Sequence, residues 1–186
     1  MNTIPLEQIN SEWSLFLDRD GVINQVKLYE NRPYPPQNLE EFEYLEESKE
    51  AVLALINKNF VVVVVTNQPD IARKTLTESL LADFHAKIGK DTKIEHFYVC
   101  PHDDTDECNC RKPKPGLILK AAQDLEIDLA NSFLVGDRWK DISAGQHAGC
   151  TSFFINNNYS EKQPEMPYIA VSSLKEATSI ILESYE

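Results

Sequence analysis

A run of six apolar residues, five of them consecutive valines, is the feature that most constrains the fold. Residues 60–65 read Phe-Val-Val-Val-Val-Val and are followed directly by the polar sequence Thr-Asn-Gln-Pro. β-Branched side chains favour strands, and a continuous apolar run is typical of a strand buried on both faces of a parallel sheet. Helices must cover both faces of such a sheet, so the run predicts an α/β fold.

Apolar runs and helical patterns alternate along the rest of the chain. We expect further strands at 13–17, 94–99, 132–137 and 151–155, and helices at 48–59, 76–88, 115–125, 138–148 and 174–183. Ser48 is expected to cap the first helix. Three prolines within residues 29–38 exclude a central strand or helix there, which predicts a loop or a small flap. The pattern predicts one domain, residues 1–186, built on a doubly wound parallel sheet, with a flap at about 25–40 and no large cap domain.

Charge and hydropathy exclude several classes of protein. The net charge of −12 argues against a general nucleic-acid binder, which would carry a basic stripe. No apolar stretch approaches the ~20 residues that span a bilayer, and the N-terminus lacks the features of a secretory signal. We therefore expect a soluble, cytoplasmic protein without a membrane partner. A site without a large cap also favours a monomer.

Polar clusters follow directly after three of the expected strands. They are Asp18 with Asp20, Thr66 with Asn67, and Asp137 with Asp141. In open α/β sheets, ligands bind at the carboxyl ends of the strands. These clusters therefore predict a ligand site at that edge, although they assign no role to Asp141.

Two carboxylates in the sequence Asp18-Arg19-Asp20-Gly21 suit phosphoryl chemistry. One carboxylate can attack phosphorus to form an acyl phosphate. The other can protonate the departing oxygen and then deprotonate the incoming water. An Asp-x-Asp-Gly sequence is also a common solvated turn, and these residues alone leave both interpretations open.

Residues elsewhere in the chain could neutralise a phosphoryl group during its transfer. Asp18 and Asp137 could hold a hard cation through oxygen ligands. Lys112, with Arg111 beside it, could neutralise the remaining oxygens, and the Thr66 hydroxyl could donate to one of them. Taken singly, Thr66 could instead cap a strand end, Lys112 could be a solvated charge, and Asp137 could cap the helix that follows. Their common order along the chain favours the phosphoryl site.

A second group of residues has the composition of a zinc site. Cys100-x-His102-x5-Cys108-x-Cys110 supplies three thiolates and one imidazole, the number of ligands in a closed tetrahedral site. Thiols clustered in a reducing cytoplasm indicate metal binding more than disulfides, with free thiols as the alternative. We expect structural zinc in a loop at about 100–110 that orders the residues after Cys110. The remaining ligand-type side chains are expected to pack or to lie on the surface: His85, His96, His147 and Cys150.

Four sequences in order, DRDGVIN, TNQ, CRKPKPG and GDRWKD, resemble the four motifs of the haloacid dehalogenase (HAD) superfamily of phosphatases. The resemblance extends from about Leu15 to Ile155. The junction of the Cys/His loop with Arg-Lys-Pro is most similar to the group of D-glycero-D-manno-heptose 1,7-bisphosphate 7-phosphatases, which also contains related histidinol-phosphate phosphatases. Such an enzyme would act in carbohydrate metabolism, in the synthesis of heptose for lipopolysaccharide or another surface polysaccharide.

The resemblance implies magnesium-dependent hydrolysis through an aspartyl phosphate. Asp18 would be the nucleophile and Asp20 the general acid and base. Magnesium would be held by the carboxylates of Asp18 and Asp137 and by the backbone carbonyl of Asp20. Thr66 and Lys112 would hold the transferring phosphoryl group.

The same resemblance assigns the substrate contacts. Asn67 would lie near the substrate, and Arg138 matches a basic position that contacts it. Arg111 would recognise a second phosphate, a task that suits a bidentate guanidinium. Pro69-Asp70 departs from the family, which has a small residue and a glycine there, and so does the segment after Asn24.

Three alternatives remain beside a heptose bisphosphate phosphatase. The same motifs could serve histidinol phosphate or another small sugar phosphate. A catalytically inactive, zinc-bearing binding protein would be expected to lack Asp18, Asp20, Lys112 or Asp137, yet all four are present. A phosphoryl-transferring mutase would need a cap that shields the aspartyl phosphate from water, and the chain leaves little room for one.

Overall fold

A six-stranded parallel sheet forms the centre of the computed structural model, which describes residues 13–185. The strands follow the order β5-β4-β1-β6-β7-β8, and every neighbouring pair is parallel. They are β1 (Ser14–Leu17), β4 (Val61–Asn67), β5 (His96–Cys100), β6 (Ser132–Gly136), β7 (Thr151–Ile155) and β8 (Ile169–Val171). The predicted doubly wound α/β architecture is confirmed, and β8 is a short edge strand that sequence patterning missed.

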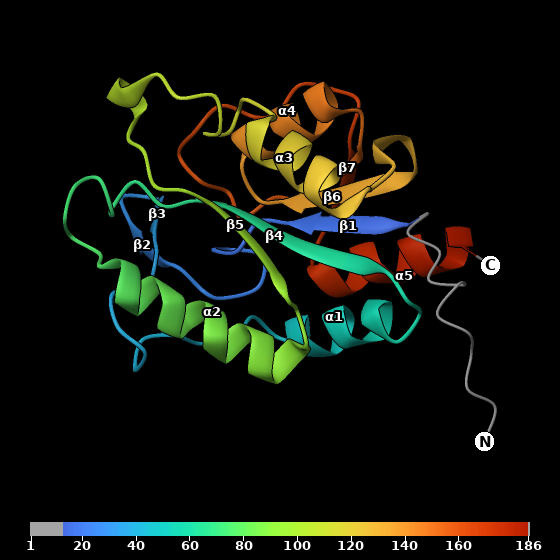
Figure 1. Ribbon diagram of the computed structural model, residues 1–186, viewed down its shortest axis with the longest axis horizontal. Helices are drawn as coiled ribbons and strands as arrows, with labels where there is room; N and C mark the ends of the chain where they lie inside the picture. The colour runs from blue at the N-terminus through green and yellow to red at the C-terminus, as the bar shows by residue number, and fades with distance from the viewer. Residues whose placement is uncertain (1–12, 186) are drawn as a thin grey trace.

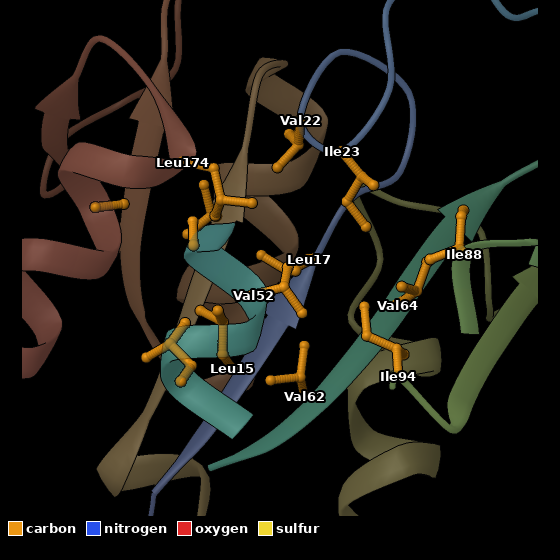
Figure 2. Close-up of a cluster of buried hydrophobic side chains, with 14 of the residues drawn as sticks. Leu15, Leu17, Val22, Ile23, Val52, Val62, Val64, Ile88, Ile94 and Leu174 are labelled. Carbon is orange, nitrogen blue, oxygen red and sulfur yellow. The ribbon is translucent and has the colours of Figure 1, made fainter. Parts of the chain in front are cut away.

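Helices cover both faces of this sheet (Figure 1). α3 (Gly116–Leu125) and α4 (Trp139–Ala148) lie on one face, and α1 (Ser48–Ile56), α2 (Glu78–Thr92) and α5 (Leu174–Tyr185) lie on the other. Within the valine run, Val62 and Val64 belong to the core beneath α1, which Figure 2 shows, whereas Val63 and Val65 belong to the core beneath α3 and α4. The run is therefore buried on both faces, as predicted. No helix within residues 13–185 is long and apolar enough to cross a membrane.

A small antiparallel hairpin stands outside the main sheet, near the carboxyl ends of its strands (Figure 1). It consists of β2 (Lys27–Tyr29) and β3 (Arg32–Tyr34). Pro33 is tolerated in β3 because a two-stranded ribbon leaves each strand with a free edge. The only other elements of the described chain are two 3₁₀ turns, Asp104–Asp106 and Leu129–Asn131, and no large cap lies within it.

The expected Ser48 cap is wrong. The N-cap of α1 is Glu47, whose φ of 58° is left-handed, and no side chain caps this end. The Ser48 hydroxyl instead donates a hydrogen bond to the carbonyl of Ile23 at 2.9 Å, in the loop after β1. Ser48 is buried, so its hydroxyl requires a partner, and the tertiary fold supplies one that local sequence cannot reveal. Several predicted boundaries also shift by two or three residues; α1, for example, ends at Ile56.

Candidate active site

The three polar clusters meet because β4, β1 and β6 are adjacent in the sheet. A cavity of about 290 Å³ opens at this edge. Its lining combines residues from the strand ends, the hairpin and the loop after β5, among them Asp18, Asp20, Thr66, Asn67, Arg111, Lys112, Arg138 and Asp141. The carboxyl edge of the sheet therefore carries most of the predicted site residues in one concave surface, and Asp137, which is not in this lining, lies beside Asp18 and Asp141.

Lys112 lies between two carboxylates and is buried. Its Nζ contacts Oδ1 of Asp18 at 2.5 Å and Oδ1 of Asp141 at 2.6 Å, and it donates to the carbonyl of Val65 at 2.8 Å. Burial lowers the pKa of Lys112, but Asp141 and Asp18 more than offset this and raise it above its usual range. Lys112 is thus a fixed buried cation rather than a solvated charge.

Asp18, Asp137 and Asp141 are all buried, and their ligand oxygens lie within 4.8 Å of one another. Burial, reinforced by Asp141 and Asp20, raises the pKa of Asp18 to about 6 although Lys112 acts against the shift. Burial followed by Asp18 and Asp141 raises the pKa of Asp137 well above its usual range. Lys112 can balance only one of three negative charges, so the cluster suits a divalent cation.

The two aspartates after β6 have different partners. Asp141 accepts from the backbone N–H of Arg138 at 2.9 Å through Oδ2 and pairs with Lys112 through Oδ1, so both its oxygens are occupied. The N-cap residue of α4 is therefore Arg138 rather than Asp137, and Asp141, in the first turn, accepts from the backbone of that N-cap residue. Oδ1 of Asp137 is buried without a hydrogen-bond partner among the described residues. An unpaired buried carboxylate oxygen fits a hard cation, which oxygen ligands bind best.

Asp20 is oriented by three neighbours. Arg19 donates to both its oxygens, with a shortest contact of 2.7 Å, and Asn24 donates to Oδ1 at 2.9 Å. Gln68, which directly follows β4, donates to Oδ2 of Asp20 at 2.8 Å and to Thr66 Oγ1 at 2.9 Å. Sequence analysis assigned no role to Gln68 or Arg19, although both lie inside motifs that it recognised.

Asn67 lines the cavity and also connects two segments of the chain through hydrogen bonds. Its side-chain N–H donates to the carbonyl of Lys112 at 3.1 Å, and its side-chain oxygen accepts from the backbone N–H of Lys112 at 3.1 Å. This reciprocal pair attaches the end of β4 to the loop that carries Lys112. Sequence analysis expected only that Asn67 lies near the substrate.

The four predicted zinc ligands come together at the end of β5 and in the loop that follows it. The separations among Cys100 Sγ, His102 Nδ1, Cys108 Sγ and Cys110 Sγ that are within contact distance run from 3.2 to 3.6 Å. Ligands about 2.3 Å from a tetrahedral zinc would be about 3.8 Å apart, close to this arrangement. The thiols are free of disulfides, and the residue types fit Zn²⁺.

Basic side chains line part of the cavity. Arg111 pairs with Asp104 at 2.7 Å and donates to the carbonyl of His102 at 3.1 Å, so the Cys/His loop itself holds it. Arg138 pairs with Glu161 at 2.6 Å. Arg73 and Lys140, which sequence analysis did not single out, also lie in the lining, as do Pro69 and Asp70, which depart from the family motif.

Comparisons with known proteins point to one group of enzymes. The HAD-hydrolase-like family model matches residues 109–177. The chain is 35% identical over 175 residues to D-glycero-alpha-D-manno-heptose-1,7-bisphosphate 7-phosphatase of Campylobacter jejuni, covering 91% of this chain and 96% of that protein. It is 36% identical over 143 residues to D-glycero-beta-D-manno-heptose-1,7-bisphosphate 7-phosphatase of Escherichia coli, covering 70% and 72% of the two chains.

A solved structure agrees with these relatives. The D,D-heptose 1,7-bisphosphate phosphatase of B. bronchiseptica, crystallised with magnesium and phosphate, superposes with a TM-score of 0.82. The match has 27% sequence identity and covers 92% of this chain and 99% of that one.

Proposed function

The chain belongs to the HAD superfamily of phosphatases, in the heptose bisphosphate phosphatase group, and we propose that it removes the 7-phosphate of a D-glycero-D-manno-heptose 1,7-bisphosphate. The observation that carries this proposal is the buried contact of Lys112 with Asp18 and Asp141 at the carboxyl edge of the sheet. This contact brings together Asp18, the nucleophile expected from the first motif, and Lys112, the positively charged residue expected from the third. The near full-length similarity to heptose bisphosphate phosphatases supports the choice of substrate.

In this proposal, Asp18 attacks phosphorus and becomes an aspartyl phosphate, while Asp20 gives a proton to the departing sugar oxygen. Asp20 then takes a proton from the water that cleaves the acyl phosphate and releases inorganic phosphate. The contacts from Arg19 and Gln68 hold Asp20 in the cavity wall, as this role requires. Thr66 and Lys112 would hold the transferring phosphoryl group, Thr66 through its hydroxyl and Lys112 through its positive charge, because the N–H groups of Lys112 already contact Asp18, Asp141 and the carbonyl of Val65.

We propose Asp18, Asp137 and the backbone carbonyl of Asp20 as the residues that hold magnesium. A magnesium ion held there would neutralise charge on the phosphoryl oxygens during transfer. The excess of buried negative charge and the unpaired oxygen of Asp137 support this assignment. A structure with magnesium and phosphate in a member of the same group supports it as well.

Substrate selection is assigned to the basic wall of the cavity. Arg111 would bind the phosphate that is not hydrolysed, and Arg138 and Asn67 would contact the sugar side of the substrate. Structural zinc on Cys100, His102, Cys108 and Cys110 would fix the position of Arg111, because Arg111 follows the last ligand and bonds to the carbonyl of His102. A disordered loop would displace both Arg111 and Lys112.

A phosphate-release assay tests the proposal. The purified protein would be supplied with magnesium and, separately, with the α and β anomers of the heptose 1,7-bisphosphate, the 1-phosphate and histidinol phosphate. We expect release of one phosphate from a bisphosphate, loss of turnover with Asp18→Asn, and much weaker activity on histidinol phosphate. A preference for histidinol phosphate would refute the substrate, and full activity of Asp18→Asn would refute the nucleophile.

A further inference from the structure

Asp137 is contacted by two polar side chains from the segment that follows β7. The Tyr159 hydroxyl donates to Oδ2 of Asp137 at 2.6 Å, and the Asn157 amide donates to the same oxygen at 3.1 Å. The Asn157 amide also reaches the Tyr159 hydroxyl oxygen and the carbonyl of Gly21, each at 3.1 Å. No motif includes Tyr159, which lies 22 residues after Asp137.

Tyr159 and Asn157 both donate to the same carboxylate oxygen of Asp137, and neither contacts the other oxygen. Oδ2 of Asp137 receives both hydrogen bonds, whereas Oδ1 is buried without a partner among residues 13–185. Asp137 lies with Asp18 and Asp141 in the carboxylate cluster. With Oδ2 occupied, the side chain cannot rotate freely, and Oδ1 is the oxygen left for a cation.

A phenol is well suited to this position. It donates a hydrogen bond without carrying a positive charge, so it orients Asp137 without neutralising the charge that attracts a cation. A lysine or arginine in its place would compete with that cation. Space is also restricted, because a Cβ added at Gly21 would clash with Oδ2 of Asp137 and lie 2.7 Å from the Tyr159 hydroxyl.

Contacts on the C-terminal side of Tyr159 fix its segment. The backbone N–H of Ser160 donates to the carbonyl of Asn31 at 2.8 Å, in the turn of the hairpin. Glu161 pairs with Arg138 at 2.6 Å. The Tyr159 side chain is buried, with 8% of its surface exposed. Its hydroxyl is therefore a rigidly placed donor rather than a mobile surface group.

We propose that Tyr159, supported by Asn157, is a positioning residue for the metal site: it occupies Oδ2 of Asp137 and thereby presents Oδ1 to the divalent cation. This inference rests on the proposed magnesium-dependent function and adds residues that the family motifs do not contain. Partners that orient metal ligands typically change metal affinity by 10- to 100-fold when they are removed.

The test compares Tyr159→Phe with Tyr98→Phe, both in zinc-loaded protein. Tyr98 is a matched control because its hydroxyl also donates to an aspartate, Asp124, at 3.0 Å, and neither residue lines the cavity or belongs to the carboxylate cluster. Binding of Mn²⁺, used as a spectroscopic substitute for Mg²⁺, is titrated without substrate by electron paramagnetic resonance. We expect Tyr159→Phe to raise the Mn²⁺ dissociation constant about tenfold or more and Tyr98→Phe to leave it unchanged. Asn157→Ala should shift it in the same direction by a smaller factor.

A kinetic measurement separates positioning from a general loss of structure. Tyr159→Phe should need more Mg²⁺ for half-maximal activity yet recover most of kcat at saturating Mg²⁺. A kcat that stays low at every Mg²⁺ concentration, or an unchanged Mn²⁺ dissociation constant, overturns the role of Tyr159. Wild-type protein that binds no Mn²⁺ would refute the proposed metal site, and this inference with it. Failure of the Tyr159 role alone would instead show as a wild type that binds Mn²⁺ and a Tyr159→Phe variant that binds it equally well.

Discussion

Replacing Asp18 with asparagine should stabilise the magnesium-free protein at neutral pH, even though it removes the proposed nucleophile. Asp18 is buried beside Asp141 and Asp20, and Lys112 only partly compensates, so its pKa rises to about 6. At neutral pH the folded chain therefore holds an ionised carboxylate in an unfavourable place. Asparagine has nearly the same shape and no charge, so it avoids this cost.

The size and sign of the effect follow from the pKa. A rise from 3.8 to about 6 corresponds to about 3 kcal/mol, since each pKa unit is worth about 1.4 kcal/mol. The folded state binds this proton more tightly than the unfolded state. The stability contributed by the protonated group is thus fully present below pH 3.8 and is lost as the pH rises through about 6. Asp18→Asn should therefore match the wild type near pH 4 and exceed it by up to about 3 kcal/mol at pH 8.

Urea unfolding in magnesium-free buffer between pH 4 and 8 measures this difference directly. Titrating groups outside the carboxylate cluster are common to both proteins and cancel in the comparison. Inside it, loss of the Asp18 charge lowers the pKa of Asp137, which adds to the gain at high pH, and lowers the pKa of Lys112, which acts against it. Asp83→Asn, at an exposed position on α2, is the control and should change stability by less than about 0.5 kcal/mol at every pH. A difference between Asp18→Asn and wild type that does not vary with pH, or a variant less stable at pH 8, would refute the reasoning.

Three further substitutions test other parts of the site. Asn67→Ala removes two hydrogen bonds to the backbone of Lys112, each worth about 1 kcal/mol. Urea unfolding should therefore show a free energy of unfolding lower by about 2 kcal/mol, and kcat should fall as well. Unchanged stability would contradict the role of Asn67 in attaching β4 to the loop that carries Lys112. Arg111→Ala should lower kcat/KM more for the bisphosphate than for a monophosphate, by about 10- to 100-fold for a charged contact; equal losses would place Arg111 on the reacting phosphate. Cys108→Ser should release zinc, as elemental analysis would show, and lower kcat/KM in a protein that stays folded with a modestly lower Tm. A zinc-free variant with full activity would show that zinc does not place the cations.

Sequence patterns predicted the elements whose signals are local. The valine run predicted a strand buried on both faces, and in the structure its side chains alternate between the two hydrophobic cores. Gly116 was expected near the start of a helix, and α3 begins there. Such predictions succeed because propensity, periodicity and turn chemistry act over a few residues. The spacing of Cys100, His102, Cys108 and Cys110 is local in the same sense, since all four lie within residues 100–110.

Partnerships between distant residues were decided by the tertiary structure. Lys112 and Asp18 are separated by 94 positions in the chain, and their contact exists only because β1 and β4 are adjacent and the loop after β5 folds over them. The burial that shifts the pKa of Asp18 likewise depends on packing from several elements. Ser48 shows the same effect in a helix, because its hydroxyl donates to the carbonyl of Ile23 instead of capping the start of α1.

The sequence by itself determined which side chains are present and placed most of them at strand ends, where a parallel sheet brings ligands together. It did not determine which oxygen of each carboxylate is occupied. That depends on donors such as Tyr159 and Asn157, whose segment carries no motif and reaches Asp137 only through the fold. Hydrogen bonds act over about 3 Å in space and are indifferent to separation along the chain, so the orientation of the site is a property of the tertiary structure.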